Sequence, residues 1–357
     1  MEIETILRRA IDCGASDIFV VAGLPLTFKV RGEQVRDEAA GKYTPQMTES
    51  FAQAVYQLAG RESHCVTGRE TDDDFSFSLS GIGRFRVNMF RQRGSIAAVV
   101  RVISFGLPTA EEAHIPPEVM QVANMKKGIV LVTGAAGSGK STTLACIINQ
   151  INHSRSGHIL TLEDPVEYIH RHGQCIISQR EIHIDCPSYV AALRSALRES
   201  PDVILLGEMR DRETMEVAMT AAETGQLLLS SLHTTGAANT IDRIIDAFPP
   251  NQQSQIRLQL SMVLQAVISQ QLVPGVDGQP IPAFEIMYTT MAIRNMIRES
   301  KTHLLESAIA SGGAMGMRTM DMALTELVTQ GKITKEAALT HCVNYETMKN
   351  RLGMTGM

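Results

Sequence analysis

The apolar and polar positions of the first hundred residues follow two different periods. Apolar residues recur at helical spacing along residues 3–11 and again along 45–58. In residues 75–79 and 85–89, apolar and polar side chains alternate, as they do on a strand with one buried face. Strands are predicted at 18–22, 26–30, 75–79, 85–89 and 95–103. The pattern therefore predicts a small α+β domain.

From residue 128 onward, short and continuously apolar runs replace the alternation. They predict strands at 129–132, 158–162, 203–206 and 227–232. Helical patterns lie between these runs: one covers 188–199 and starts at a serine N-cap, and another is bounded by Asp211 and Gly225. Strands that alternate with helices in this way are typical of a parallel sheet, which binds ligands at the carboxyl ends of its strands. The predicted fold class is α/β.

Three prolines mark residues 107–118 as a linker between these two patterns. The predicted organisation is therefore an N-terminal domain over 1–106, the linker, and a second domain over 119–357. Within the second domain, a helical region is predicted from about residue 290.

The composition restricts the classes of function. A net charge of −5 argues against nucleic-acid binding through bulk charge. The six cysteines form no C-x-x-C pair, which favours reduced thiols in the cytosol over a zinc ribbon or a disulfide framework. The first residues lack the pattern of a signal peptide. The charge-free run 258–276 contains glutamines and a proline, so it predicts a buried or interface helix rather than a membrane span.

A glycine-rich segment directly after the strand at 129–132 carries the clearest chemistry. It fits G-x-x-x-x-G-K-[ST], in which backbone N–H groups and the start of the next helix surround a phosphate. Lys140 is expected to hold the β- and γ-phosphates, and the Ser141 hydroxyl to ligate Mg²⁺. The expected nucleotide-binding residues are Gly134, Ala135, Ala136, Gly137, Ser138, Gly139, Lys140, Ser141 and Thr142. A chance glycine-rich turn is the alternative, but the flanking strand and helix supply the context that the motif requires.

Polar side chains follow three other predicted strands. They are Glu163, Glu208 and His233. Hydrolysis of a γ-phosphate requires a carboxylate that orients or deprotonates water and cations that neutralise developing charge, and these residues together with Lys140 and Mg²⁺ supply both. Each has a structural alternative: a surface turn at Glu163, an ion pair of Glu208 with Arg210, and a hydrogen-bonded histidine at a strand end.

Four segments in this order resemble the secretion and type IV pilus ATPases. They are 134–142, Leu-Glu-Asp-Pro-Val-Glu at 162–167, 201–211 and Leu-His-Thr-Thr at 232–235. Within that superfamily, residues 292–299 and 316–324 are most similar to the pilus retraction motors. The resemblance implies a PAS-like N-terminal domain, a RecA-like P-loop domain and a homo-hexameric ring that binds ATP and Mg²⁺.

The resemblance also implies roles for single residues. Glu163 would be the general base on water, Glu208 the Walker B carboxylate that works with Mg²⁺, and His233 part of the histidine box. Arg86 and Arg101 resemble the arginines with which the N-terminal domain reaches nucleotide, although both also fit solvated strand arginines.

The implied activity is ATP hydrolysis that powers retraction of a type IV pilus. The implied partners are an inner-membrane platform protein and a paralogous pilus ATPase, and the implied place is the cytoplasmic face of the membrane. Alternatives are an accessory paralogue, an extension or secretion ATPase, and a nucleotide-gated scaffold with negligible turnover. A DNA translocase is disfavoured by the acidic net charge.

Gln226 and the segment 292–299 lie outside these assigned roles. Gln226 stands where close relatives usually have the second histidine of the histidine box, which calls a normal coupling rate into question. In residues 292–299, Ile293 and Ile297 share an apolar helical face, while Arg294 and Arg298 form a charged stripe at i, i+4. This stripe predicts contact with a partner or a neighbouring subunit, and an ordinary amphipathic helix that packs on the sheet is the alternative.

Overall fold

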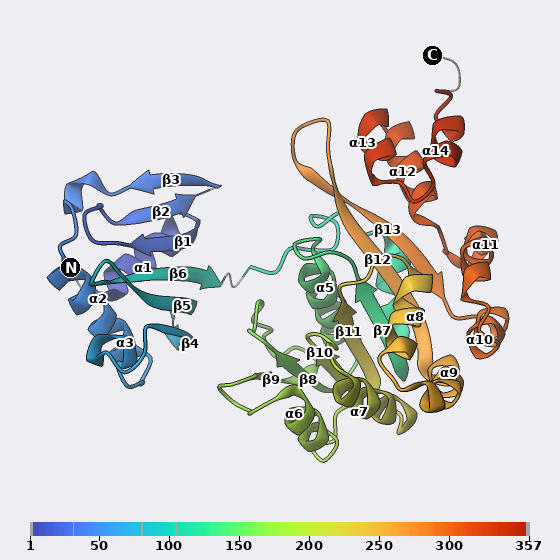
Figure 1. Cartoon of the computed structure of the whole chain (residues 1–357), viewed down its shortest axis with the longest axis horizontal. Helices are drawn as coiled ribbons and strands as arrows, with labels where there is room; N and C mark the ends of the chain where they lie inside the picture. The colour runs from blue at the N-terminus through green and yellow to red at the C-terminus, as the bar shows by residue number, and fades with distance from the viewer. Residues whose placement is uncertain (1–2, 31, 80, 104–105, 355–357) are drawn as a thin grey trace. The chain divides into compact units, whose positions relative to one another are not determined.

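The computed structural model describes residues 3–30, 32–79, 81–103 and 106–354 (Figure 1). The chain separates into two compact units. Residues 1–106 form the first unit together with Glu167–Ile169, and residues 107–166 and 170–357 form the second.

The described part of the first unit contains an antiparallel sheet of six strands in the order β3-β2-β1-β6-β5-β4. Its elements are α1 (Ile3–Asp12), β1 (Ala15–Val20), β2 (Thr27–Val30), β3 (Glu33–Arg36), α2 (Pro45–Leu58), α3 (His64–Thr67), β4 (Asp72–Leu79), β5 (Gly83–Gln92) and β6 (Ser95–Ile103). Alternate side chains of β5, including Phe85 and Val87, are buried together with Leu7 of α1 and Val55 of α2. The period of two in the sequence therefore corresponds to one buried sheet face.

The described part of the second unit is built on a sheet of seven strands in the order β13-β12-β7-β11-β10-β8-β9. All neighbours are parallel except β12 and β13. Its strands are β7 (Gly128–Thr133), β8 (Gly157–Glu163), β9 (Cys175–Glu181), β10 (Val203–Leu206), β11 (Leu227–Leu232), β12 (Leu264–Pro274) and β13 (Pro280–Tyr288).

Helices cover both faces of this sheet (Figure 1). They are α4 (Pro117–Met120), α5 (Lys140–Ser154), α6 (Tyr189–Ala196), α7 (Arg212–Glu223), α8 (Ala237–Asp246), α9 (Pro250–Val263), α10 (Met291–Arg298), α11 (Leu305–Ser311), α12 (Met320–Thr329), α13 (Lys335–His341) and α14 (Tyr345–Arg351). Along β7, Ile129 and Leu131 belong to the core under α6–α11, whereas Val130 and Val132 belong to the core under α5. Burial on both faces explains why these strands are continuously apolar.

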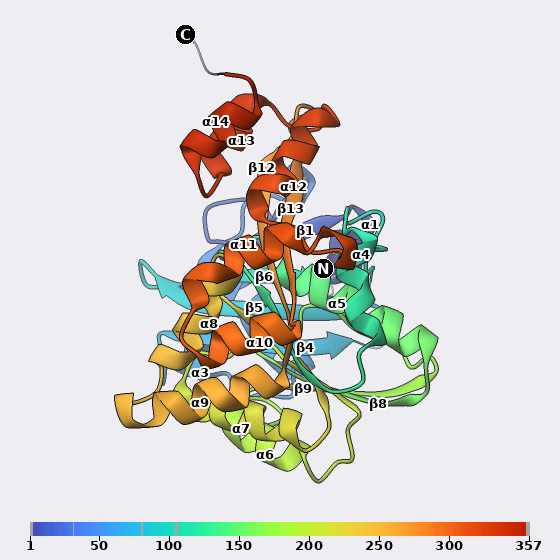
Figure 2. The same cartoon turned by 90° about the vertical axis from the view of Figure 1, so that its right-hand side faces the viewer.

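Helices α12–α14 form a smaller cluster at one end of the β12–β13 hairpin (Figure 2). Val273 and Ala283 of the hairpin pack there against Met320, Leu324 and Met348 of these helices. This cluster is distinct from the two cores on the faces of the sheet, so α12–α14 are joined to the rest of the unit mainly through the hairpin.

The helix predicted over 258–276 is wrong. Helix α9 ends at Val263, and the following residues form β12, which pairs with β7 in parallel. A strand buried on both faces lacks alternation, so its pattern cannot be separated from that of a buried helix. In the segment predicted as a linker, Leu107, Ala110 and Ala113 pack against the core under α5. None of the helices in the described ranges is long and apolar enough to cross a membrane.

Candidate active site

The glycine-rich segment connects β7 to α5 at the carboxyl edge of the sheet. Gly134, Gly137 and Gly139 have φ values of +142°, +75° and +89°, which disfavour residues with a side chain. The segment then enters α5, whose N-terminal backbone N–H groups carry partial positive charge. Its middle residues, Ala135 to Gly137, are exposed. The local conformation therefore presents backbone to a ligand, as a phosphate-binding loop requires.

Two polar side chains of the loop are placed to respond to a phosphate. The ammonium of Lys140 donates to the carbonyl of Gly134 at 2.9 Å and to that of Ala135 at 2.8 Å. The hydroxyl of Ser138 is buried without a hydrogen-bond partner among the described residues. Ser141, in the first turn of α5, exposes its side chain to solvent. The donor set and the cradle thus fit the phosphates of a nucleotide.

Gln270 of β12 packs against the loop, a contact that the sequence pattern does not predict. A β-carbon at Gly134 would lie 2.1 Å from the carbonyl oxygen of Gln270, and one at Gly139 would lie 2.8 Å from its side-chain Nε2. The amide Oε1 of this buried residue accepts a hydrogen bond of 2.8 Å from Thr143. The sequence does not distinguish it from Gln265 and Gln271 of the same strand.

The strand order brings three further candidates to the same edge. Strands β7, β11, β10 and β8 are neighbours in this order, so the loop, His233, Glu208 and Glu163 follow adjacent strand ends. Backbone bonds continue this alignment beyond the strands: Gly207 N–H donates to the Leu162 carbonyl at 2.8 Å, and Gly134 N–H to the Leu232 carbonyl at 3.2 Å. The structure thus brings the predicted residues of the second unit together.

Glu208 lies between a guanidinium and an imidazole at the end of β10. Its side chain is mostly buried, with Oε1 at 2.6 Å from the Arg210 guanidinium and Oε2 at 3.4 Å from His233 Nε2. The hydrogen bond and the charge of Glu208 raise the pKa of Arg210. These three side chains line a cavity of about 300 Å³ together with Thr234 and Arg243, among others. The Glu208–Arg210 ion pair expected as the structural alternative is present, and it coexists with the contact to His233.

Tyr189, the first residue of α6, also lies near the predicted carboxylates, and no sequence pattern predicts it there. Burial raises its pKa, and the nearby carboxylates of Asp164, Glu208 and Glu163 raise it further. A β-carbon at Gly207 would lie 2.9 Å from the tyrosine hydroxyl. Gly207 therefore leaves room for the protonated Tyr189 hydroxyl near the carboxylates of Glu163 and Glu208. Glu163 itself is half-buried and lies 3.4 Å from the Gln179 side-chain amide, which donates to it.

Arg86 and Arg101 lie in the first unit, directly opposite each other on β5 and β6. Arg86 donates to both carboxylate oxygens of Asp74, at 3.1 and 2.6 Å, and Arg101 donates to Asp17 at 3.0 Å. The prediction that they lie on neighbouring strands is confirmed. Their action on nucleotide stays a prediction.

Gln226 precedes β11, whereas His233 follows it. A strand rises about 3.3 Å per residue, so the seven-residue separation of Gln226 and His233 corresponds to about 23 Å along the strand. Gln226 forms a hydrogen bond with Thr224 at 2.8 Å instead. A direct effect of Gln226 on the nucleotide edge of its own sheet is therefore excluded, and the expected effect on turnover would have to arise elsewhere.

The charged stripe of residues 292–299 is only partly a free surface. Ile293 and Ile297 of α10 are fully buried, and the Arg294 guanidinium donates to the carbonyls of Ser261 and Met262, at 2.5 and 2.7 Å, at the end of α9. Arg294 thus caps a helix C-terminus, where carbonyls lack partners. Arg298 is exposed. The amphipathic-helix alternative therefore accounts for Arg294, and the partner-contact hypothesis rests on Arg298.

Comparison with known proteins defines the class. The model of the type II/IV secretion system protein family matches residues 2–335, and the chain belongs to this family. It is 44% identical to the type IV pilus retraction ATPase PilT of Pseudomonas aeruginosa, over 95% of this chain and 97% of that protein. The type IV pilus ATPase PilU of the same organism is 40% identical over 96% of this chain and 88% of its own length.

A crystal structure of the pilus retraction motor PilT with bound ADP superimposes with a TM-score of 0.89 at 42% identity, over 98% of this chain and 99% of that one. The ATPase DotB of Legionella pneumophila gives 0.76 at 26% identity, over 95% and 94%. The resemblance inferred from the four motifs is confirmed. So is the predicted fold class, an α/β P-loop unit with a parallel-rich sheet after a small α+β unit.

Proposed function

We propose that this protein is an ATP-hydrolysing motor that powers retraction of a type IV pilus. The observation that carries the proposal is the alignment of four adjacent strand ends, which places the glycine-rich loop, His233, Glu208 and Glu163 along one edge. The similarity to PilT along nearly the whole length of both chains supports the retraction function. It also supports ATP as the nucleotide.

The loop binds the phosphates. Its backbone N–H groups and the start of α5 supply positive potential, and Lys140 exchanges the carbonyls of Gly134 and Ala135 for the β- and γ-phosphates. Because the ammonium is already held inside the loop, little side-chain entropy is lost when the phosphates arrive.

Ser141 and Glu208 are the residues that would hold Mg²⁺. A bound Mg²⁺ neutralises charge on the phosphates and takes its remaining ligands from them and from water, so few protein ligands suffice. Glu163 orients and deprotonates the attacking water from the adjacent strand end. Tyr189 keeps its proton between the carboxylates and so separates their charges.

Arg210 compensates the charge of Glu208, and His233 lies 3.4 Å from the other carboxylate oxygen. Hydrogen bonding from His233 to the γ-phosphate would break its contact with Glu208, so the segment after β11 reports whether the phosphate is present. Arg86 and Arg101 supply further positive charge for the transition state, in the manner of an arginine finger.

The protein works as a homo-hexamer at the cytoplasmic face of the inner membrane, bound to a pilus platform protein. An accessory role beside a paralogous ATPase is the second candidate, because the similarity to PilU also extends over nearly the whole chain. Fibre retraction in cells that carry this protein as their only such ATPase separates these two functions: an independent motor retracts fibres there, and an accessory one does not.

Glu163→Gln tests the chemistry. ATP binding should persist while turnover falls by about 10² to 10⁴, the usual range for loss of a general base. Glu216→Gln, on the exposed side of α7, is the matched control and should keep wild-type turnover. Negligible turnover of the pure wild-type hexamer would instead favour a nucleotide-gated scaffold, and unchanged turnover of Glu163→Gln would assign the base to another residue.

A further inference from the structure

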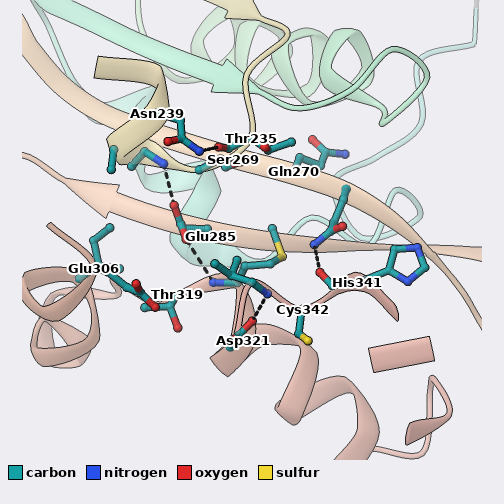
Figure 3. A pocket seen from close by; sticks show the side chains of 17 residues that line it. Thr235, Asn239, Ser269, Gln270, Glu285, Glu306, Thr319, Asp321, His341 and Cys342 are labelled. Atoms are coloured by element: carbon teal, nitrogen blue, oxygen red, sulfur yellow. Dashed lines mark hydrogen bonds between the residues drawn. The ribbon is translucent and has the colours of Figure 1, made fainter. Parts of the chain in front are cut away.

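A carboxylate on the outermost strand of the sheet joins two helices that belong to different parts of the second unit. Glu285 of β13 accepts a hydrogen bond of 2.8 Å from the N–H of Ala237, the first residue of α8. Its other oxygen accepts one of 3.3 Å from the N–H of Met320, the first residue of α12. Figure 3 marks both hydrogen bonds of Glu285 with dashed lines. One buried side chain therefore caps both helices.

The register of the sheet connects Glu285 to the nucleotide edge. Thr133, which precedes the phosphate-binding loop, pairs with Ser269 of β12, and Ser269 pairs with Glu285. Ser269 accepts a hydrogen bond of 2.8 Å from Gly236. The cross-strand pair thus holds two consecutive N–H groups, those of Gly236 and Ala237, directly after the segment that carries His233.

On the other side, the first turn of α12 continues the connection. Asp321, next to Met320, is buried and accepts hydrogen bonds from Val343 and Asn344 at 2.7 and 3.1 Å, at the start of α14. Gln271 of β12 donates to the carbonyl of His341 at the end of α13 at 3.0 Å. Polar contacts of the hairpin and of α12 therefore reach each helix of the α12–α14 cluster.

A cavity of about 440 Å³ lies around this junction. Its lining includes Ala237 and Asn239 of α8 and Met320 and Asp321 of α12. Figure 3 shows Asn239 and Asp321 on opposite sides of Glu285. Close packing transmits displacement between helices, and a cavity interrupts it. The hydrogen bonds of Glu285 therefore provide a direct mechanical link where packing is incomplete.

We propose that Glu285 is a positioning residue that transmits the nucleotide state of the His233–Ala237 segment to α12–α14. This inference rests on the proposed function, since it assigns the path by which that site acts on the rest of the motor. A shift of the segment on phosphate binding displaces the N-terminus of α8. Glu285 passes the displacement to Met320, and Asp321 carries it to the start of α14. The burial that raises the pKa of Glu285 also makes an unpaired carboxylate costly, so the two bonds resist separation.

Glu285→Gln tests the link, because an amide has the same size but only one accepting oxygen, so one of the two N–H groups loses its acceptor. Glu306→Gln is the matched control: Glu306 lines the same cavity, is exposed, and makes no hydrogen bond with α8 or α12 among the described residues. Amide hydrogen exchange of the full-length wild type and both variants is measured with and without a non-hydrolysable ATP analogue. Residues 134–143 report binding, and residues 318–329 report α12.

In the wild type and Glu306→Gln, both segments should change exchange when the analogue binds. In Glu285→Gln, the exchange of the loop should respond to the analogue as before, whereas that of 318–329 should no longer respond. The KM for ATP should stay within about twofold of wild type. The kcat should fall by about fivefold or more, which is the low end of the usual coupling between two sites. An equal response of 318–329 in Glu285→Gln, or its absence in the wild type while the loop responds, would overturn the link. Absence of any response at the wild-type loop would overturn the proposed function itself, and the link with it. The wild-type comparison stands even where the variant does not fold.

Discussion

The carbonyl oxygen of Gln270 occupies the space that a side chain at Gly134 would need. A β-carbon there would stand 2.1 Å from this oxygen, far inside van der Waals contact. The oxygen belongs to the backbone of β12, which is paired on both sides and cannot move aside. The first glycine of the loop is thus required by its packing as well as by its φ angle.

Gly134→Ala should therefore abolish nucleotide binding by displacing the loop from β12. Gly137→Ala is the matched control, because a β-carbon at Gly137 would meet nothing within 4 Å and the change costs only the conformational strain of a positive φ, about 1–2 kcal/mol. Titration with a fluorescent ATP analogue should show binding by Gly137→Ala and none by Gly134→Ala. Equal affinities would show that Gln270 does not confine the loop.

The sequence predicted those features that depend on residues close together in the chain. Strand β10, for example, has the predicted bounds, and Asp211 caps α7 by accepting from Thr214, because a four-residue apolar run and an N-cap are local signals. The conjunction of Glu163, Glu208 and His233 was also predictable, since the carboxyl ends of parallel strands meet at one edge.

Long-range contacts escaped the sequence analysis. Gln270 contacts Thr143 across 127 positions, and nothing in the sequence links one of the several glutamines of this strand to the loop. The sequence likewise predicts Arg294 to be a surface charge, because its contact with the end of α9 joins residues far apart in the chain. Glu285 can accept from both α8 and α12 only in the observed register of β12 and β13. The side-chain pattern of buried strands specifies such a register poorly.

Arg294 and Arg298 should differ in what they contribute. Arg294→Ala removes the donor from two carbonyls at the end of α9 and should lower the free energy of unfolding by about 1–3 kcal/mol. Arg298 is exposed, so Arg298→Ala should change the free energy of unfolding by no more than about 0.5 kcal/mol. ATP turnover should stay within about twofold of wild type. Urea denaturation at fixed protein concentration measures the first effect. Loss of fibre retraction by Arg298→Ala alone would assign an output contact to this residue, and normal retraction would remove the stripe as an output element.

His170 should make the stability of the second unit sensitive to acid. Burial lowers its pKa from 6.5 to about 4, so the unfolded chain binds a proton in this range while the folded chain does not. Stability is therefore lost as the pH falls from about 6.5 to about 4, by at most about 1.4 kcal/mol per pH unit. His170→Gln should reduce the slope of unfolding free energy against pH in this window, whereas the exposed His303→Gln serves as the control for loss of a histidine. Identical slopes for wild type and His170→Gln would contradict this assignment.

Arg86 offers a test of whether one subunit completes the site of another. Its guanidinium forms an ion pair with Asp74 on the neighbouring strand. If it stabilises the negative charge of the transition state, it should raise turnover by about 10³-fold or more. Arg86→Ala should therefore hydrolyse ATP poorly while still binding it, whereas Arg84→Ala, two residues away on the same strand, should remain active.

Unlike Arg86→Ala, Lys140→Ala should not bind ATP at all, because the phosphates lose their main cation. Mixing full-length Lys140→Ala with full-length Arg86→Ala then distinguishes two geometries. If the arginine acts across subunits, some interfaces of a mixed ring combine an intact loop with an intact arginine, and turnover rises above that of either variant alone. If it acts within its own chain, every site lacks one of the two groups and the mixture stays inactive. Exchange of subunits must be verified by mass spectrometry of the mixed rings, since unmixed rings would also be inactive.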